Sequence, residues 1–360
     1  MTDTQIVHSF PLTLLGSRRK PVPHIIAVGG GKGGVGKSSV ALMLALALSS
    51  RGHQTIIIDA DLTGANLHGY LGVEDTERSL LTFLRSKDKK LQDLVQATRF
   101  QRLSAIVGSL GMGSASPWRY DDSRRLLQQL RRLPAPYVVV DLGAESSLLE
   151  IDLFLAADSG VVVSTNDAVS LHNVFQFIRT AVLRKMRRQL LQHREWQETL
   201  HLFMEKSESS AAVSLEALFR EWGYSPNWIR EITASIRPRL IINMSEPNES
   251  SQNVQSLRLA ASQLLSVHVD FGGVVQADAR VRQALKERRP DILSHRENRA
   301  YADIVRYLDR HGLGLEKQVQ QVRDARPAGM GALKNWLRGT LCSTRCLAWQ
   351  TCPVKRSEEH

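Results

Sequence analysis

The stretch that decides the fold is "VGGGKGGVGKSS", which runs from Val28 to Ser39. It continues a β-branched run, "HIIAV", that is typical of a buried strand, and it leads into "SVALMLALALSSRG", an apolar stretch long enough to form a helix. A glycine-rich loop between a strand and a helix lets backbone N–H groups surround an anion at the helix N-terminus. We therefore expect this segment to bind phosphate, which a flexible glycine linker would not explain.

The spacing within the loop fits the Walker A pattern G-x-x-x-x-G-K-[ST]. In this pattern the lysine reaches the β- and γ-phosphates, and the hydroxyl group binds Mg²⁺. These roles fall to Lys37 and Ser38. We expect ATP and Mg²⁺ as cofactors, bound by Gly31, Lys32, Gly33, Gly34, Val35, Gly36, Lys37, Ser38 and Ser39.

A second lysine, Lys32, lies five residues before Lys37. The form "KGGVGKS" resembles the deviant P-loop of the MinD/ParA family of ATPases, and "DLGAESSLLEIDLFLAADSGVVVSTNDAVSLHNVFQFI" looks like the MinD branch that includes FlhG and FleN. The resemblance implies an ATP-dependent homodimer in which Lys32 serves the ATP of the partner subunit. In the alternative interpretation, Lys32 is merely a solvated side chain, although a flexible ammonium group beside a phosphate loop would be drawn to the anion.

Apolar runs alternate with helical patterns along the rest of the chain. Six further runs predict strands buried on both faces: "TIIIDAD", "LSAIVGSL", "PYVVVDLG", "SGVVVSTN", "RLIINMS" and "FGGVVQ". This alternation predicts an α/β fold with a doubly wound, mostly parallel sheet flanked by helices, as in P-loop NTPases. Ligands of such sheets bind at the carboxyl ends of the strands.

Acidic residues stand at two of these strand ends. Asp59 and Asp61 share one face after "TIII" and can reach a metal ion or an attacking water. Asp141 ends "PYVVVD" as a Walker B aspartate that would hold Mg²⁺. We predict Ser38, Asp59 and Asp141 as metal-binding residues, and Lys32, Lys37 and Asp61 as catalytic residues. As an alternative, Asp61 caps the following helix.

Two asparagines receive roles from the resemblance alone. In similar ATPases an asparagine that matches Asn66 senses the nucleotide, and one that matches Asn243 reads the adenine edge. Asn243 could instead be a turn residue with a satisfied side chain. Gly143 follows Asp141 at a position where the family has a glycine close to the γ-phosphate.

The chain divides into three parts. Residues 1–23 form an N-terminal extension, residues 24–312 form the ATPase domain, and residues 313–360 form a linker and a basic, cysteine-containing tail. A helical insertion at about residues 185–238 holds Trp196, Trp222 and Trp228. These tryptophans either pack the insertion onto the domain or dock a partner.

Composition narrows the partners. The net charge of +11 and pI near 9.8 favour an anionic partner, either nucleic acid or an acidic membrane surface. No apolar run is long enough to span a bilayer, and the N-terminus lacks a secretory h-region, so we expect a cytoplasmic protein. Basic clusters at residues 179–194 and 278–299 fit either solvated helix faces or nonspecific DNA binding.

The tail leaves three interpretations open. "ALKNWLRGTLCSTRCLAW" places apolar and basic side chains on different helical faces, as in segments that lie at the inner face of a membrane. Otherwise it is a disordered tail, or a metal site made by Cys342, Cys346 and Cys352.

These features predict a switch of the MinD or FlhG type that dimerises with ATP and hydrolyses it slowly. Its predicted role is spatial organisation. We also expect an activating protein, which the sequence does not identify. A ParA-like ATPase that partitions DNA or cargo is the second hypothesis. An iron–sulfur carrier is the third, although the chain lacks the central C-x-x-C of those proteins.

Overall fold

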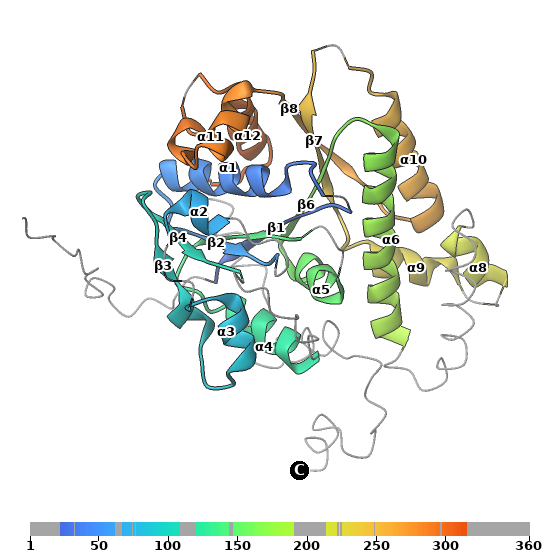
Figure 1. Cartoon of the computed structure of the whole chain (residues 1–360). Helices are drawn as coiled ribbons and strands as arrows, with labels where there is room; N and C mark the ends of the chain where they lie inside the picture. Colours follow the sequence, from blue (N-terminus) through green and yellow to red (C-terminus); the bar gives the residue numbers. More distant parts are fainter. Residues whose placement is uncertain are drawn as a thin grey trace, which may run out of the picture.

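The computed structural model describes most of the chain between residues 22 and 314 (Figure 1). The described residues are 22–31, 33–61, 67–73, 75, 77–108, 120–143, 147–190, 214–221, 223, 225–247, 249–295 and 297–314. Of the predicted linker and tail at residues 313–360, only Leu313 and Gly314 are described, and the three cysteines lie outside the described residues.

The centre of the described structure is one eight-stranded sheet with the order β3-β4-β2-β5-β1-β6-β7-β8. All neighbours are parallel except β3 and β4. The strands are β1 (His24–Gly29), β2 (Thr55–Asp59), β3 (Gln96–Ala97), β4 (Leu103–Ile106), β5 (Tyr137–Asp141), β6 (Ser159–Ser164), β7 (Arg239–Ser245) and β8 (Asp270–Gln276).

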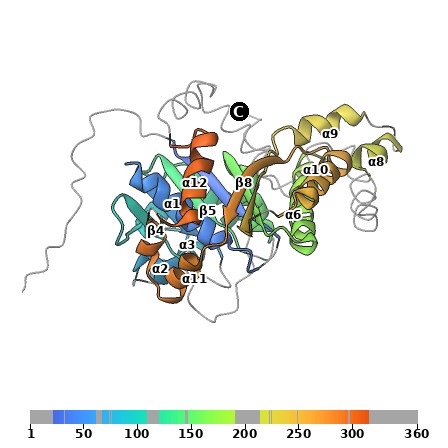
Figure 2. The same ribbon diagram turned by 90° about the horizontal axis from the view of Figure 1, so that it is seen from above.

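Helices cover both faces of this sheet, as Figure 2 shows from above. They are α1 (Lys37–Ser50), α2 (Leu67–Leu71), α3 (Leu80–Arg85), α4 (Tyr120–Leu130), α5 (Leu148–Ala156), α6 (Ala168–Leu190), α8 (Leu215–Glu221), α9 (Pro226–Thr233), α10 (Gln252–Leu265), α11 (Ala279–Lys286) and α12 (Arg299–Arg310). Short 3₁₀ helices span Leu91–Leu94 and Pro290–Ile292.

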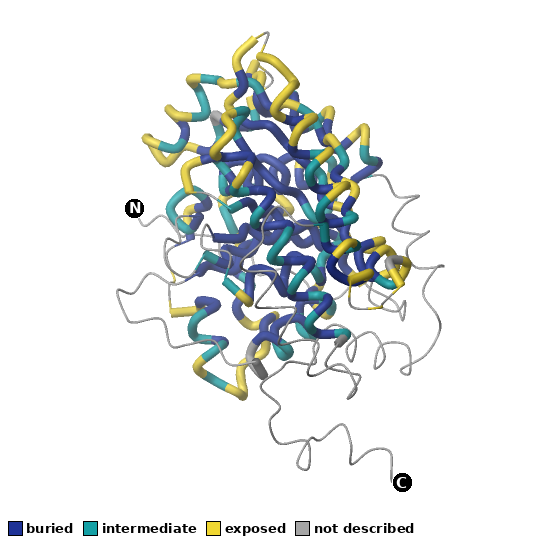
Figure 3. Tube along the Cα trace, turned by 90° about the vertical axis from the view of Figure 1, so that its right-hand side faces the viewer, coloured by how far each residue is buried: buried dark blue, intermediate teal, exposed yellow. Residues whose placement is uncertain are grey.

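Two apolar cores lie on opposite sides of the sheet. One core joins the sheet to α1, α2, α11 and α12, and the other joins it to α3, α4, α5, α6 and the helices beyond. The central strands of the sheet are the most buried part, and exposed positions lie mainly on the helices, the loops and the edge strand β8 (Figure 3). The predicted α/β fold with a mostly parallel sheet is therefore confirmed.

All six of the runs predicted as strands after the glycine loop form strands in the sheet. Strands β2, β5 and β6 are recognisable because both of their faces are buried, so their sequences are continuously apolar. The prediction of burial on both faces is wrong for β8, which lies at the edge of the sheet and exposes Phe271 and Val274. Strand β3 has only two residues at the edge of the sheet and was not predicted. A segment this short carries no periodicity that the sequence could reveal.

Helix α1 is apolar on all sides because it is buried on all sides. It packs on β1, β2 and β5 with one face and on α12 with the other. Every residue from Lys37 to Ser49 is buried except Ser38. The helix that follows the glycine loop is thus fixed between two layers, which holds the loop in place at its N-terminus.

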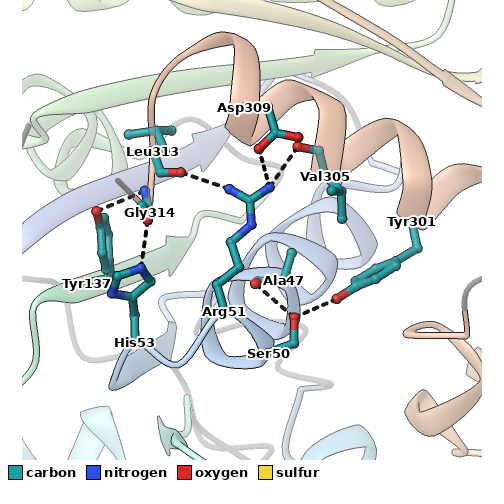
Figure 4. A network of polar contacts seen from close by, with 10 residues as sticks. All are labelled: Ala47, Ser50, Arg51, His53, Tyr137, Tyr301, Val305, Asp309, Leu313 and Gly314. Carbon is teal, nitrogen blue, oxygen red and sulfur yellow. Dashed lines mark hydrogen bonds and ion pairs between the residues drawn. The ribbon is translucent and has the colours of Figure 1, made fainter. Parts of the chain in front are cut away.

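The end of α12 is tied to the end of α1 by a polar network (Figure 4). Arg51 donates to the carbonyl oxygens of Leu313 and Val305, at 3.1 and 3.2 Å, and forms an ion pair with Asp309 at 2.6 Å. The backbone N–H of Gly314 donates to the Tyr137 hydroxyl at 2.9 Å. These bonds close the chain over α1, and hydrogen bonds of this kind each contribute about 0.5 to 1.5 kcal/mol.

The predicted insertion begins inside α6, and its described part includes α8 and α9. Trp228 packs against the main core and stacks on Phe219, with 5.3 Å between ring centroids. Phe219 also belongs to the insertion, so the prediction that tryptophan packs the insertion onto the domain stays a prediction. Trp196 and Trp222 lie outside the described residues.

Within the described part of the chain, no helix has the length and apolar character needed to cross a bilayer.

Candidate nucleotide-binding site

The glycine loop joins β1 to α1 at the carboxyl edge of the sheet, and three of its glycines, Gly30, Gly31 and Gly36, have no room for a side chain. A Cβ atom on Gly31 would lie 2.2 Å from the carbonyl oxygen of Asn173 in α6. A Cβ atom on Gly36 would lie 2.2 Å from Nδ2 of Asn243, and Gly36 has a φ of 86° that favours glycine. The loop therefore follows a tight path in which the backbone itself faces the site.

Asn243 of β7 is buried under this loop. Its Nδ2 atom donates a hydrogen bond to the carbonyl oxygen of Val35 at 2.9 Å. This bond links the far half of the sheet to the phosphate loop. The side chain thus has a structural partner in the loop, and its predicted contact with the adenine base stays a prediction.

Lys37 is the first residue of α1, and its ammonium group faces three carboxylates. Burial lowers the pKa of Lys37, while the charges of Asp141, Asp61 and Glu150 oppose that shift, in this order of strength. The lysine is thus a buried cation held by acidic neighbours, at the position where the motif places the β- and γ-phosphates. A bound polyphosphate would share this cation with the carboxylates.

Asp141 is the strongest candidate for a metal ligand. It is fully buried, the Ser38 hydroxyl hydrogen-bonds to its carboxyl group, and its Oδ1 atom has no hydrogen-bond partner among the described residues. Burial, followed by the charge of Asp59, raises the pKa of Asp141 well above its usual range. A buried carboxylate oxygen without a partner, beside a serine hydroxyl, fits Mg²⁺, which takes a few protein oxygens together with phosphate and water.

Asp59 lies directly beside Asp141, because the two residues pair in the register of β2 and β5. Its Oδ1 atom accepts from the backbone N–H of Asp61, and its Oδ2 atom accepts from the N–H of Leu67, both at 3.2 Å. Leu67 begins α2, so Asp59 stabilises the start of that helix. Asp59 therefore shapes the loop that presents Asp61, and its predicted place near the metal stays a prediction.

Asp61 lies next to Gly143, the second residue after Asp141. A Cβ atom on Gly143 would lie 3.2 Å from the Cγ atom of Asp61. The same Cβ would lie 2.3 Å from Oε1 of Glu150. Asp61 is thus close to Lys37 and to the backbone after the Walker B strand, where a carboxylate can orient water beside a terminal phosphate.

Glu150 is a site residue that the sequence analysis missed. It is buried at the start of α5 and interacts with both Lys37 and Asp61. The signal that could have revealed it is the capping-box pattern S-x-x-E formed by Ser147 and Glu150, directly after the Walker B strand. That pattern predicts the start of a helix, and here the helix starts at the site.

The structure thus brings together most of the predicted site residues. Lys37, Ser38, Asp59, Asp61 and Asp141 meet at one edge of the sheet, with Asn243 behind the loop. Lys32 and Asn66 lie outside the described residues, so their roles stay predictions.

Residues 21–192 match the ParA family model described as "NUBPL iron-transfer P-loop NTPase". This segment contains the glycine loop and every predicted carboxylate of the site.

Two curated proteins illustrate the range of relatives. The flagellum site-determining protein YlxH of Helicobacter pylori is 30% identical over 161 residues, which are 43% of this chain and 52% of the relative. The cytosolic Fe-S cluster assembly factor CFD1 of Chaetomium globosum is 52% identical over 56 residues, which are 16% of this chain and 18% of the relative. The chain spans about half or less of the length of these relatives.

Among solved structures, the septum site-determining protein MinD of Pyrococcus horikoshii, in complex with Mg-ADP, superposes with a TM-score of 0.54 and 18% identity. The match covers 82% of this chain and 99% of that protein. At this identity, the likeness is one of fold.

Proposed function

We propose that this chain, whose residues 21–192 match the ParA family model, is an ATP-hydrolysing switch that dimerises when ATP and Mg²⁺ are bound. The observation that carries the proposal is the convergence of Lys37, Asp61 and Asp141 at the end of the phosphate loop. Lys37 would hold the β- and γ-phosphates, and Ser38 and Asp141 would hold Mg²⁺. The metal ion would neutralise charge on the phosphates.

The switch would have two states that differ in nucleotide. In the ATP state, Lys32 of each subunit would contact the nucleotide of the other, so ATP would bind at the dimer interface. Asp61 would orient the water that attacks the γ-phosphate, and hydrolysis would return the protein to monomers. A partner protein would set the rate of this reset.

We propose spatial organisation as the output, with the protein at the inner face of the cell membrane. The similarity to a flagellum site-determining protein supports a role in placing a cellular structure. The tail supports membrane contact, because "ALKNWLRGTLCSTRCLAW" separates apolar from basic side chains. One such short segment binds weakly, whereas two on a dimer bind together with a high effective concentration.

DNA binding is the second candidate, and the structure favours one of the two basic clusters for it. In the cluster at the end of α6, Arg184 and Arg188 are buried and paired with Asp152 of α5, so they are unavailable to DNA. In the cluster around α11, Arg282 and Lys286 are exposed. A DNA-binding form of the switch would use the α11 surface to contact phosphates.

An iron–sulfur role has support from the family description and from the short match to CFD1. That match covers only 56 residues. The three cysteines of the sequence, Cys342, Cys346 and Cys352, include no C-x-x-C pair and follow the domain rather than lying within it. We therefore place this role third.

The dimer can be tested through Lys32. We expect Lys32→Ala to bind ATP as a monomer with nearly normal affinity but to fail to dimerise, because its main contribution is made only when two subunits meet. Size-exclusion chromatography with light scattering, in the presence of a non-hydrolysable ATP analogue, measures this directly. Lys89→Ala, which removes an exposed lysine between α3 and the first 3₁₀ helix, is the matched control and should dimerise normally. A normal dimer of Lys32→Ala would remove Lys32 from the interface.

The output can be tested by co-sedimentation with anionic vesicles and by retention on duplex DNA, each with ATP or ADP. We expect the full chain to pellet with vesicles mainly in ATP, and a chain that ends at Ala328 to lose this binding, because it lacks the amphipathic segment. Equal pelleting of the two chains would reject the membrane role of the tail. ATP-dependent retention of both chains on DNA would support the partitioning role instead.

A further inference from the structure

We propose that Glu150 determines the preference of this site between ATP and ADP, because its carboxylate lies against Gly143, near Asp61, and opposes the negative charge of a γ-phosphate. The inference rests on the proposed binding of nucleotide at the P-loop. Glu150 lies outside the Walker motifs, and its proposed role is to discriminate between ATP and ADP. Lys37, Asp61 and Asp141 have other proposed roles.

The position of the Glu150 carboxylate is fixed from two sides. Its Oε2 atom accepts a hydrogen bond from the backbone N–H of Ser147 at 2.8 Å, and its own N–H donates to the Ser147 hydroxyl at 3.4 Å. Its Oε1 atom lies against Gly143, where even a methyl group on Gly143 would meet it at 2.3 Å. The capping box therefore holds one oxygen at the helix terminus and leaves the other turned toward the site.

ATP hydrolysis at this site does not require the Glu150 carboxylate, because the other two carboxylates near Lys37 already have proposed roles. Asp141 has a proposed role at the metal ion, and Asp61 has one at the attacking water. Glu150 interacts with the same lysine, although more weakly than the two aspartates do. Without nucleotide it is one of the three counter-charges of a buried cation. With nucleotide it becomes a negative group near the terminal phosphate.

The consequence differs between the two nucleotides. ADP ends at the β-phosphate, whereas ATP adds a charged γ-phosphate on the side of Lys37 that the carboxylates share. Charges separated by a few ångströms in a partly buried site interact strongly enough to change affinity about tenfold or more. Glu150 thus weakens ATP binding more than ADP binding, so the ATP state depends on additional contacts, such as those of a dimer.

The test is Glu150→Gln in the full chain. Glutamine also forms the capping box, so the helix start is kept and only the charge is lost. We expect the ratio of ATP affinity to ADP affinity to rise about tenfold, with ADP affinity changed by less than about twofold. The readout is competition against a fluorescent nucleotide, with Mg²⁺ in excess, a non-hydrolysable ATP analogue, and protein dilute enough to be monomeric by light scattering.

Two control variants separate charge from structure. Asp88→Asn removes an exposed carboxylate between α3 and the first 3₁₀ helix, so it changes net charge equally and should leave the ratio unchanged. Ser147→Ala removes the capping hydroxyl but keeps Glu150, so it should lower stability without raising the ratio.

An unchanged ratio in Glu150→Gln, with nucleotide still bound, would overturn the inference while leaving the proposed function intact. An equal rise in Ser147→Ala would also overturn it, since the effect would then come from the helix start. Failure of the wild type to bind either nucleotide would instead reject the proposed function itself.

Discussion

Replacing Lys37 with alanine should abolish measurable ATP binding. The ammonium group is the buried cation of the site, and a charge-assisted contact of this kind contributes about 1.5 to 3 kcal/mol, or roughly 10- to 150-fold in affinity. The loss should exceed this range, because Asp141, Asp61 and Glu150 would then face the phosphates without their counter-charge. Isothermal titration calorimetry with Mg-ATP measures the effect.

A second substitution at the same position separates charge from packing. Lys37→Met keeps an unbranched side chain of similar length in the buried first turn of α1, so it should fold like the wild type and still fail to bind ATP. Circular dichroism melting curves report whether the fold is kept. Unchanged ATP affinity in either variant would contradict the assignment of this loop as the phosphate site.

The fold could be predicted because most of its strands are buried and can be recognised from their apolar sequences. Strands buried on both faces, such as "TIIID" and "YVVVD", read as continuous apolar runs, and their alternation with helices implies a parallel sheet. The parallel sheet in turn places Asp59 and Asp141 side by side, because the carboxyl ends of neighbouring strands coincide. These carboxylates were predicted from strand ends alone.

What could not be predicted depends on contacts between distant segments. The bond from Asn243 to the Val35 carbonyl joins residues more than two hundred positions apart, and no local pattern encodes it. From the sequence, Glu150 is an ordinary helix-capping residue. Only the structure shows that its Oε1 atom lies against Gly143 while Oε2 caps the helix. The sequence also gives no sign of which hydrogen bonds an aspartate at a strand end will make, so the role of Asp59 in holding Leu67 was missed.

The basic cluster at the end of α6 shows that the sequence also does not reveal which charged side chains are buried. In the sequence, "RTAVLRKMRRQLLQHR" reads as a solvated or DNA-binding surface. In the structure, Arg184 makes two hydrogen bonds of 3.0 Å to Asp152, and Arg188 pairs with the same carboxylate. Asp152 lies in "LLEIDLFLA", an apolar helix whose sequence gives no warning of a buried ion pair. Counting charges therefore overstated the surface available to an anionic partner.

The second large effect is expected at Asp61. Asp61→Ala should lower the rate of ATP hydrolysis by about a hundredfold or more, since loss of a positioned acid–base group typically costs that much. ATP binding should change little, because Lys37, Ser38 and Asp141 keep their places. The variant should therefore accumulate as an ATP-bound dimer, which light scattering and a phosphate-release assay would detect together.

Asp61→Asn decides between the two interpretations of this residue. Asparagine caps a helix as well as aspartate does, so a capping role predicts normal hydrolysis in this variant. A water-orienting role predicts a loss close to that of Asp61→Ala, because the carboxylate charge is gone. We expect the loss, since the N–H of Leu67 at the start of α2 is already bonded by Asp59, at 3.2 Å, while Asp61 faces Lys37. Normal turnover in Asp61→Asn would move the catalytic role to another carboxylate, and Glu150 would be the next to replace, because its Oε1 atom lies against the same glycine that Asp61 faces.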